Sequence, residues 1–211
     1  MSLPQRQPLL TPQEYLARER EAATKSEYYA GKVYALAGAG RNHSAIVPNL
    51  AYLLIGQLKG RPCQVFTSDM RVKVSASGLY TYPDVAVVCG RPHFDDQVED
   101  TLLNPTVIIE VLSRSTEAYD RGEKFAHYRT LESLQDYLLA AQDIARIGHF
   151  TRQPDGAWLF AESSGPDAVV DIPSIQCRLS LAEVYDKIEL TSPSSAARFR
   201  VIREETAEFS H

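Results

Sequence analysis

Residues 106–112 read Thr-Val-Ile-Ile-Glu-Val-Leu, an apolar run that carries one carboxylate, Glu110. Residues 82–88 read Tyr-Pro-Asp-Val-Ala-Val-Val and carry Asp84 in the same way. Runs that are apolar at consecutive positions are typical of central strands, which are buried on both faces of a sheet. Because burying an unpaired carboxylate is costly, two acids in such strands favour a bound cation. The backbone carbonyl of Val111 could add a third oxygen ligand.

A lysine follows these strands in a segment with helical spacing, which predicts a helix over about residues 116–131. Lys124 lies eight residues into it (124 − 116), about 12 Å along the axis. If the helix runs back over the strand, Lys124 can reach Glu110, since helical side chains tilt toward the N-terminus. Lys124 also shares one stripe of the helix with Tyr128 and Leu131. Two acids and a lysine are the minimum set for metal-assisted phosphodiester cleavage.

Each of these residues also has a purely structural interpretation. Asp84 could cap a turn after Pro83, and Glu110 could pair with an arginine. Lys124 could form an exposed helical pair with Asp120, four residues earlier. The sequence leaves these interpretations open, but the two acids together favour a metal site.

Further elements are expected around the two strands. Residues 11–14, Thr-Pro-Gln-Glu, form a capping box that predicts a helix to about Ala22. Asn42 is expected to cap a second helix, in which Pro48 favours a kink or a late start. His43, at the start of that helix, is either a cap or core residue or part of the site. Apolar runs and turn signals predict a hairpin over 27–36, strands near 64–67, 71–74, 136–140, 146–151 and 157–161, and a short helix after a capping box at 180–183.

The length of 211 residues and the 44% hydrophobic content predict one domain over residues 1–190. Residues 191–211 are expected to be a tail that is mobile or contacts a partner. Lys and Arg number 22 against 27 Asp and Glu, and this net charge of −5 argues against a broadly basic surface for nucleic acid. A local basic rim stays open, as does an ordinary solvated edge, for Lys59, Arg61, Arg71 and Lys73.

The three cysteines, Cys63, Cys89 and Cys177, are odd in number and far apart in apolar surroundings. They are expected to be buried free thiols of a reducing cytoplasm. The N-terminus lacks the apolar segment of a signal peptide, and no run approaches the roughly 18 apolar residues of a membrane span. We therefore expect a soluble, cytoplasmic protein.

Several blocks, in order along the chain, resemble one known family. They are Lys-Ser-Glu-Tyr-Tyr-Ala-Gly at 25–31, Ser-Asp-Met-Arg-Val at 68–72, Tyr-Pro-Asp-Val at 82–85, Ile-Glu-Val-Leu-Ser at 109–113 and Ser-Thr-Glu-Ala-Tyr-Asp-Arg-Gly-Glu-Lys at 115–124. This pattern, from about Thr11 to Asp143, is similar to the Uma-type family of putative restriction endonucleases in the PD-(D/E)XK nuclease superfamily.

The resemblance implies an α/β fold with a restriction-endonuclease-like core, in which a mixed β-sheet is flanked by helices and preceded by an N-terminal helix and β-hairpin. It also implies Mg²⁺ or Mn²⁺ as cofactor and a homodimer. Asp84 and Glu110 match the metal-binding acids of the family, and Glu27 matches an acid from the early hairpin. Position 112, where the superfamily usually has its lysine, is Leu. The resemblance therefore gives the role of that lysine to Lys124 on the helix.

Together, the residues and the resemblance predict a metal-dependent endonuclease that hydrolyses DNA phosphodiester bonds. One alternative is a non-catalytic interaction protein on a nuclease scaffold, which the acidic net charge and the lack of an obvious recognition domain favour. Another is the same chemistry on RNA or on branched nucleic acid.

Overall fold

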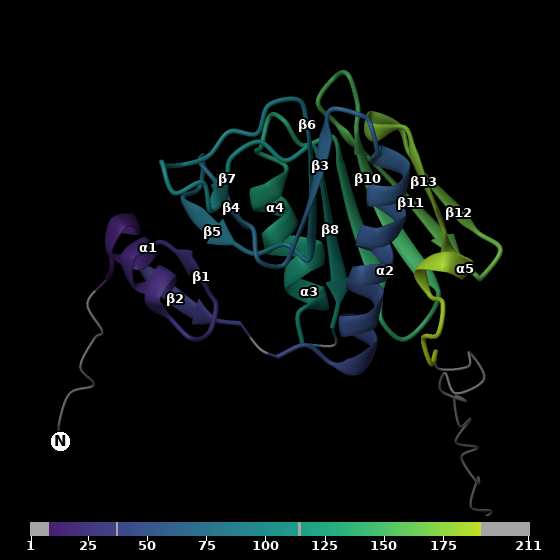
Figure 1. Ribbon diagram of the computed structural model, residues 1–211, viewed down its shortest axis with the longest axis horizontal. Coiled ribbons are helices and arrows are strands. Elements are labelled where there is room, and N and C mark those ends of the chain that lie inside the picture. The colour runs from purple at the N-terminus through teal and green to yellow at the C-terminus, as the bar shows by residue number, and fades with distance from the viewer. Residues whose placement is uncertain (1–8, 37, 114, 191–211) are drawn as a thin grey trace, which may run out of the picture.

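The computed structural model describes residues 9–36, 38–113 and 115–190 (Figure 1). The tail expected over 191–211 lies outside these residues. The single domain over 1–190 stays a prediction.

The larger of the two main sheets has six strands in the order β11-β10-β9-β8-β6-β3. The two runs that each carry an acid form its centre, with β8 at Val107–Leu112 and β6 at Val85–Cys89. β8 pairs antiparallel with β6 and parallel with β9, so the sheet is mixed as expected. The remaining strands are β3 (Cys63–Thr67), β9 (Asp136–Ala141), β10 (Arg146–Arg152) and β11 (Trp158–Ser164).

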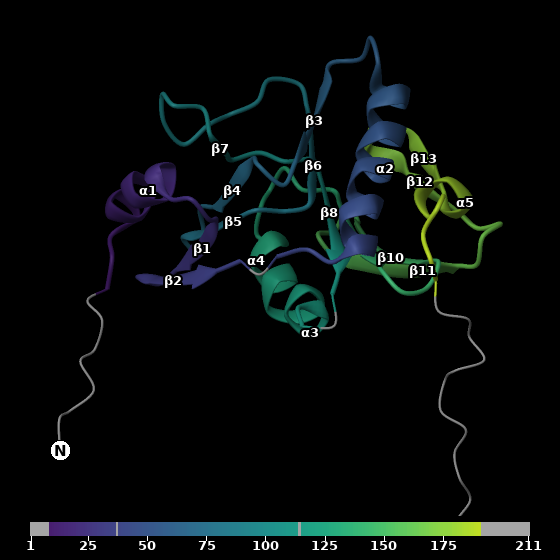
Figure 2. The same cartoon turned by 60° about the horizontal axis from the view of Figure 1, so that its bottom comes forward.

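The side chains of β8 alternate between two cores, as a strand with a period of two requires. Val107, Ile109 and Val111 belong to one buried cluster with the apolar face of α2 (Arg41–Leu58). Ile108 and Leu112 belong to another, which includes Tyr128 of α4 (Phe125–Tyr128). Figures 1 and 2 show the result, with α2 on one face of the sheet and the helical segment from α3 (Glu117–Tyr119) to α4 on the other.

A second sheet has the order β2-β1-β5-β4-β7. The predicted hairpin is present as β1 (Ser26–Tyr29) and β2 (Lys32–Ala35), and its turn has Ala30 and Gly31 at φ 49° and 83°. A Cβ on Gly31 would lie 2.8 Å from Cβ of Leu9, so space as well as conformation favours glycine there. The predicted β4 (Arg71–Val74) is confirmed, whereas β5 (Leu79–Thr81) and β7 (Thr101–Leu102) were not predicted, because two or three residues carry little periodicity.

The first helix, α1 (Pro12–Glu21), begins with the predicted capping box between Thr11 and Glu14. The expected cap of α2 is wrong, because Gly40 precedes the helix and the Asn42 amide donates to two distant backbone carbonyls instead. A late start after Pro48 is also wrong, since this proline lies inside α2. No helix in the described residues is both long enough and apolar enough to cross a membrane.

The predicted helix over 116–131 consists of α3 (Glu117–Tyr119), a π-helical turn η1 (Asp120–Lys124) and α4 (Phe125–Tyr128). The chain then continues after β11 into a small hairpin that was not predicted. It comprises β12 (Val169–Ile172), the 3₁₀ turn η2 (Pro173–Ile175) and β13 (Cys177–Ser180), followed by α5 (Leu181–Val184). The predicted capping box is wrong in detail, because the Ser180 side chain makes no capping hydrogen bond.

Two of the three cysteines are not free thiols. Cys63 on β3 lies directly opposite Cys89 on β6, and the two form a disulfide. Only Cys177, which is buried, is free as predicted. The pairing depends on strand register, which a separation of 26 residues in sequence does not reveal. The argument from free thiols to a reducing compartment therefore loses its support.

Candidate active site

The two acids meet at one end of the central strand pair. Val85 lies opposite Ile109 in this antiparallel pair. Asp84 precedes Val85 and Glu110 follows Ile109, so both acids lie at the same end of the two strands. The amide of Asp84 donates to Oε2 of Glu110 at 3.4 Å, and the amide of Val111 donates to Oδ2 of Asp84 at 2.7 Å. Asp84 therefore binds the neighbouring strand and does not cap a turn after Pro83.

Lys124 reaches these acids from the helix. Its ammonium group lies 2.8 Å from Oε1 of Glu110, 3.3 Å from Oε1 of Glu27 and 3.7 Å from Oδ1 of Asp120. The four side chains are 5–8% exposed. The structure thus brings Glu27, Glu110 and Lys124 together beside Asp84, although their catalytic roles stay predictions.

The π-helical turn explains how the helix presents two residues inward. Asp120 and Lys124 are its first and last residues, and both are buried. Such turns change the direction of side chains and are frequent at functional sites. The exposed pair considered from the sequence is therefore wrong, because Asp120 shares the buried Lys124 with two glutamates.

Each glutamate is also held by a hydroxyl group. The Thr81 side chain on β5 donates to Oε1 of Glu27, and the Tyr128 hydroxyl donates to Oε1 of Glu110 at 2.9 Å. Lys124 and Tyr128, which the sequence places on one stripe of the helix, are both buried. Thr81 was missed, since the register that places it near Glu27 is set by the unpredicted strand β5.

His43 completes the cluster from the first turn of α2. Its Nε2 lies 3.1 Å from Oδ2 of Asp84. Burial opposes the charged imidazolium, but the hydrogen bond and charge of Asp84 outweigh it and raise the pKa of His43. The structure places His43 beside Asp84, and a role of His43 in the site stays a prediction. Figure 2 brings forward the edge where β8 ends, α2 begins and α3 lies.

The cluster carries more negative than positive charge. Burial raises the pKa of Glu110 to about 8, and the charges of Asp84 and Asp120 act in the same direction against the attraction of Lys124. Burial also raises the pKa of Asp120. Although burial disfavours the ammonium form of Lys124, Glu110, Glu27 and Asp120 outweigh it and hold its pKa well above the usual range.

A family model described as Uma2, putative restriction endonuclease, matches residues 12–183. The chain belongs to the Uma2 family. This confirms the resemblance seen in the sequence. Uma2 membership supports a nuclease and hence a nucleic acid as its substrate.

Two similar proteins come from Synechocystis sp.. Uncharacterized protein sll1609 is 40% identical over 163 residues, which cover 77% of this chain and 92% of that protein. Uncharacterized protein slr1290 is 36% identical over 178 residues, covering 84% and 92%.

A crystal structure with the same architecture is that of a putative nuclease belonging to DUF820 from Anabaena variabilis. It matches with a TM-score of 0.67 and 21% identity, covering 83% of this chain and 97% of that chain. This likeness confirms the predicted fold of the Uma2 chain.

Restriction-endonuclease-like families generally use divalent metals, and the donor atoms in this Uma2 chain fit such an ion. Lys124 and Tyr128 both bind Oε1 of Glu110, so that among the described residues Oε2 has only the long bond from the Asp84 amide. Asp84 likewise makes its contacts with Val111 and His43 through Oδ2. Mg²⁺ commonly takes one or two carboxylates and keeps several waters, so one oxygen from each acid suffices. For Val111 the described contact is its amide, and the role of its carbonyl as a ligand stays a prediction.

The raised pKa of Glu110 predicts a pH dependence of stability in the absence of divalent ions. The pKa is about 8 in the folded protein against an ordinary value of 4.5, so between these values the folded state holds a proton that the unfolded state loses. The resulting stabilisation is complete below about pH 4.5 and is lost as the pH rises through about 8. We expect the free energy of unfolding, measured with urea, to fall over this range in the wild type.

Glu110→Gln should flatten this part of the pH profile, because glutamine does not titrate. The control is Glu183→Gln, which alters an exposed carboxylate on α5. Parallel profiles for the wild type and Glu110→Gln would show that Glu110 is not the group responsible.

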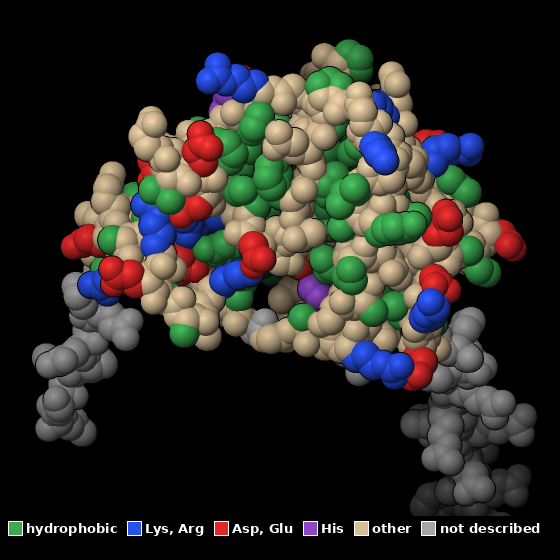
Figure 3. All heavy atoms as spheres, viewed as in Figure 1, with side chains coloured by type: hydrophobic (Ala, Val, Ile, Leu, Met, Phe, Trp, Pro, Cys, Tyr) green, Lys and Arg blue, Asp and Glu red, His purple; other side chains and the backbone are tan. Residues whose placement is uncertain are grey.

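Two of the four residues of the basic rim considered from the sequence are paired with acids. Lys73 pairs with Asp95 at 2.7 Å, and Arg71 pairs with Asp100 at 2.9 Å. Both acids belong to the loop between β6 and β7. Figure 3 shows basic and acidic side chains side by side on the face in view, without a continuous basic patch. Any contact of this face with phosphates would therefore be local.

Proposed function

We propose that this Uma2 chain is a metal-dependent endonuclease that hydrolyses phosphodiester bonds in DNA. The observation that carries the proposal is the convergence of Asp84, Glu110 and Lys124 at one end of the central strands. Glu27 joins them through its contact with Lys124 at 3.3 Å. Family membership supports the nuclease class, and the acids support the metal dependence.

Asp84 and Glu110 would hold the divalent ion, which would supply Lewis acidity at the phosphodiester and make water more acidic. The chain itself keeps both acids in position. Val111 and His43 fix Asp84, while Tyr128 and Lys124 fix Glu110. The Lys124 ammonium also offsets the negative charge that develops on a reacting phosphate. Glu110, Glu27 and Asp120 keep this lysine charged, because their negative charges hold its pKa high.

DNA as the substrate and the homodimer come from the family resemblance. They belong to the proposal as predictions. RNA and branched nucleic acid stay as alternative substrates for the same site.

The proposal can be tested by incubating the purified chain with supercoiled plasmid, single-stranded DNA or RNA. We expect nicked or linear plasmid with Mg²⁺ or Mn²⁺ and intact plasmid with EDTA. Cleavage of RNA alone would move the substrate to the alternative class. Cleavage that persists in EDTA, or no cleavage of any substrate, would contradict the proposal.

A non-catalytic interaction protein is the second candidate, and one observation favours it. Lys124 already partly neutralises the buried acids, and the described residues contain no group of three or more His, Cys, Asp or Glu placed to hold a metal. Titration calorimetry with Mn²⁺ separates the candidates. The nuclease requires binding that Glu110→Gln weakens, whereas a scaffold predicts no binding or binding that is unaffected by this substitution.

A further inference from the structure

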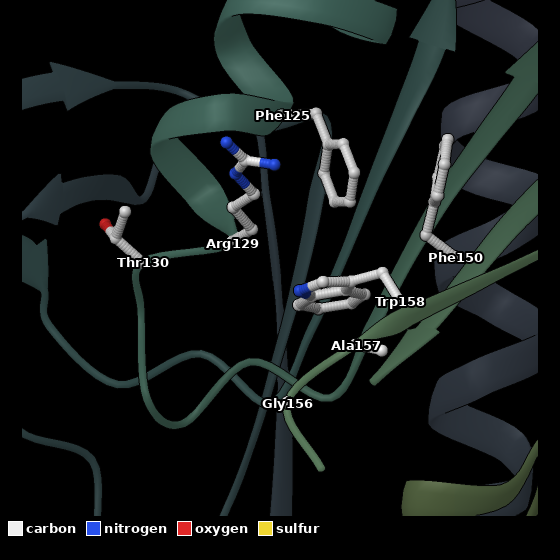
Figure 4. A pocket seen from close by; sticks show the side chains of 7 residues that line it. All are labelled: Phe125, Arg129, Thr130, Phe150, Gly156, Ala157 and Trp158. Atoms are coloured by element: carbon white, nitrogen blue, oxygen red, sulfur yellow. The ribbon is translucent and has the colours of Figure 1, made fainter. Parts of the chain in front are cut away.

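A pocket of about 590 Å³ lies outside the acid cluster, between the end of α4 and the β10–β11 hairpin. Three of its lining side chains are aromatic, namely Phe125, Phe150 and Trp158, and a fourth is Arg129 (Figure 4). This volume lies within the usual range for small-ligand sites. None of the functional residues described above lines it.

The aromatic walls are held in fixed positions. Phe125 stacks on Phe150 at 4.3 Å between ring centroids and meets Trp158 at nearly a right angle, 84°. Behind it, Phe125 lies parallel to Tyr137, which is fully buried, at 5.2 Å. Phe160 extends the row by packing on Phe150 at 4.7 Å. These contacts hold the rings in place, so the apolar surface that they leave open to the pocket needs little rearrangement to bind a ligand.

A second residue, Arg152, holds the Trp158 ring in position. The Arg152 guanidinium lies 4.8 Å from the centre of the Trp158 ring. That guanidinium donates to the backbone carbonyls of Leu134, Arg129 and Leu131 at 2.7–2.8 Å. Arg152 thus ties the end of α4 to β10 and fixes the indole ring at the same time.

The charge at the pocket is positive on a chain whose net charge is −5. Arg129 is exposed, and no hydrogen bond or ion pair of its guanidinium occurs within the described part of the chain. The pocket lining includes no Asp or Glu. Flat apolar walls beside an available guanidinium match a ligand that is both aromatic and anionic, which is the chemistry of a nucleotide.

We propose that this pocket binds one unstacked base of a single-stranded nucleic acid, with Arg129 on a neighbouring phosphate. The choice of a nucleic acid as ligand rests on the proposed function. The pocket borders the helix that carries the site, since Phe125 follows Lys124 directly in the chain. A base in a duplex is paired and stacked, so a fixed pocket of this kind favours strands whose bases are already free.

Trp158 is the only tryptophan of the chain, so its fluorescence reports directly on the pocket. The full chain is titrated in EDTA, where cleavage does not interfere, with a single-stranded oligodeoxynucleotide of mixed sequence. We expect saturable quenching. A strand of the same length with abasic sites should bind more weakly and quench little, as should the matching duplex.

Variants test the contribution of stacking through the anisotropy of a labelled strand. Trp158→Ala should weaken binding about 5- to 150-fold, the range for loss of one stacked base. Trp158→Phe should keep most of the affinity, and Arg129→Ala should weaken it and make it less dependent on salt. Tyr52→Ala is the matched control, because Tyr52 is a 76% exposed aromatic residue on α2. Circular dichroism melting checks that each variant folds.

Equal affinity for the intact and abasic strands would overturn the proposal. So would a Trp158 signal that changes with protein concentration but not with nucleic acid, since a second copy of the chain would then fill the pocket. Quenching in EDTA without cleavage in Mg²⁺ would keep this proposal and reject the nuclease. Normal cleavage by Trp158→Ala, together with equal binding of intact and abasic strands, would keep the nuclease and reject the base-binding pocket.

Discussion

Asp84→Asn is expected to reduce metal-dependent cleavage by about 10³-fold or more and to leave the fold intact. The rate falls because a ligand of the ion loses its charge, and a bound metal contributes several kcal/mol to the stabilisation of a transition state. Stability should change by no more than about 1 kcal/mol, because an asparagine oxygen can still accept the Val111 amide. Removing the Asp84 charge also relieves its repulsion with Glu110.

The measurements are plasmid cleavage rates and thermal melting of the wild type and Asp84→Asn. Asp171→Asn is the control, because it alters an exposed carboxylate that pairs with Arg178. NMR titration adds an independent reading, since the pKa of His43 should fall when the charge of Asp84 is lost. Unchanged cleavage in Asp84→Asn would remove this residue from the site.

Lys124→Met is expected to affect both stability and cleavage. Glu27, Glu110 and Asp120 would be left buried without the ammonium group that contacts all three. Removing one partner from a buried ionic cluster costs about 3–5 kcal/mol. The loss of stability should be smaller at about pH 5 than at about pH 8, because Glu110 and Asp120 have raised pKa values and can take up protons at the lower pH. If the variant stays folded, cleavage should fall about 10²- to 10³-fold, as for the loss of one group that stabilises the transition state.

The double variant Lys124→Met with Asp120→Asn separates the two effects. Removing one of the unpaired charges should restore part of the stability but none of the cleavage. Urea denaturation measures the first and plasmid cleavage the second. Lys187→Met, at an 89% exposed side chain, is the matched control. Recovery of cleavage together with stability would mean that Lys124 has only a structural role.

The sequence was most informative where local chemistry decides the structure. The capping box at Thr11, the hairpin with Gly31 and the long apolar strands β6 and β8 were all predicted, because each depends on neighbours in the chain. Helical spacing alone predicted that Lys124 and Tyr128 share one stripe of the helix, and the structure shows that both are buried. Family resemblance added Glu27, which has no local pattern of its own.

The predictions that failed depend on register and on distant partners. The Cys63–Cys89 disulfide needs the pairing of β3 with β6, and Asn42 does not cap α2 because carbonyls in other segments bind its amide. Asp120 looked like an exposed partner of Lys124, because an ordinary helical spacing gives no sign of a π turn. These features are set by tertiary packing and not by any short stretch of sequence.

The most direct test of the metal site is the anomalous scattering of a crystal soaked in Mn²⁺. We expect a peak beside the carboxylates of Asp84 and Glu110, with the Lys124 amine directed toward the same space, and no such peak in Asp84→Asn. A wild-type crystal with no peak between these acids, or with manganese bound only elsewhere, would contradict the metal-dependent site.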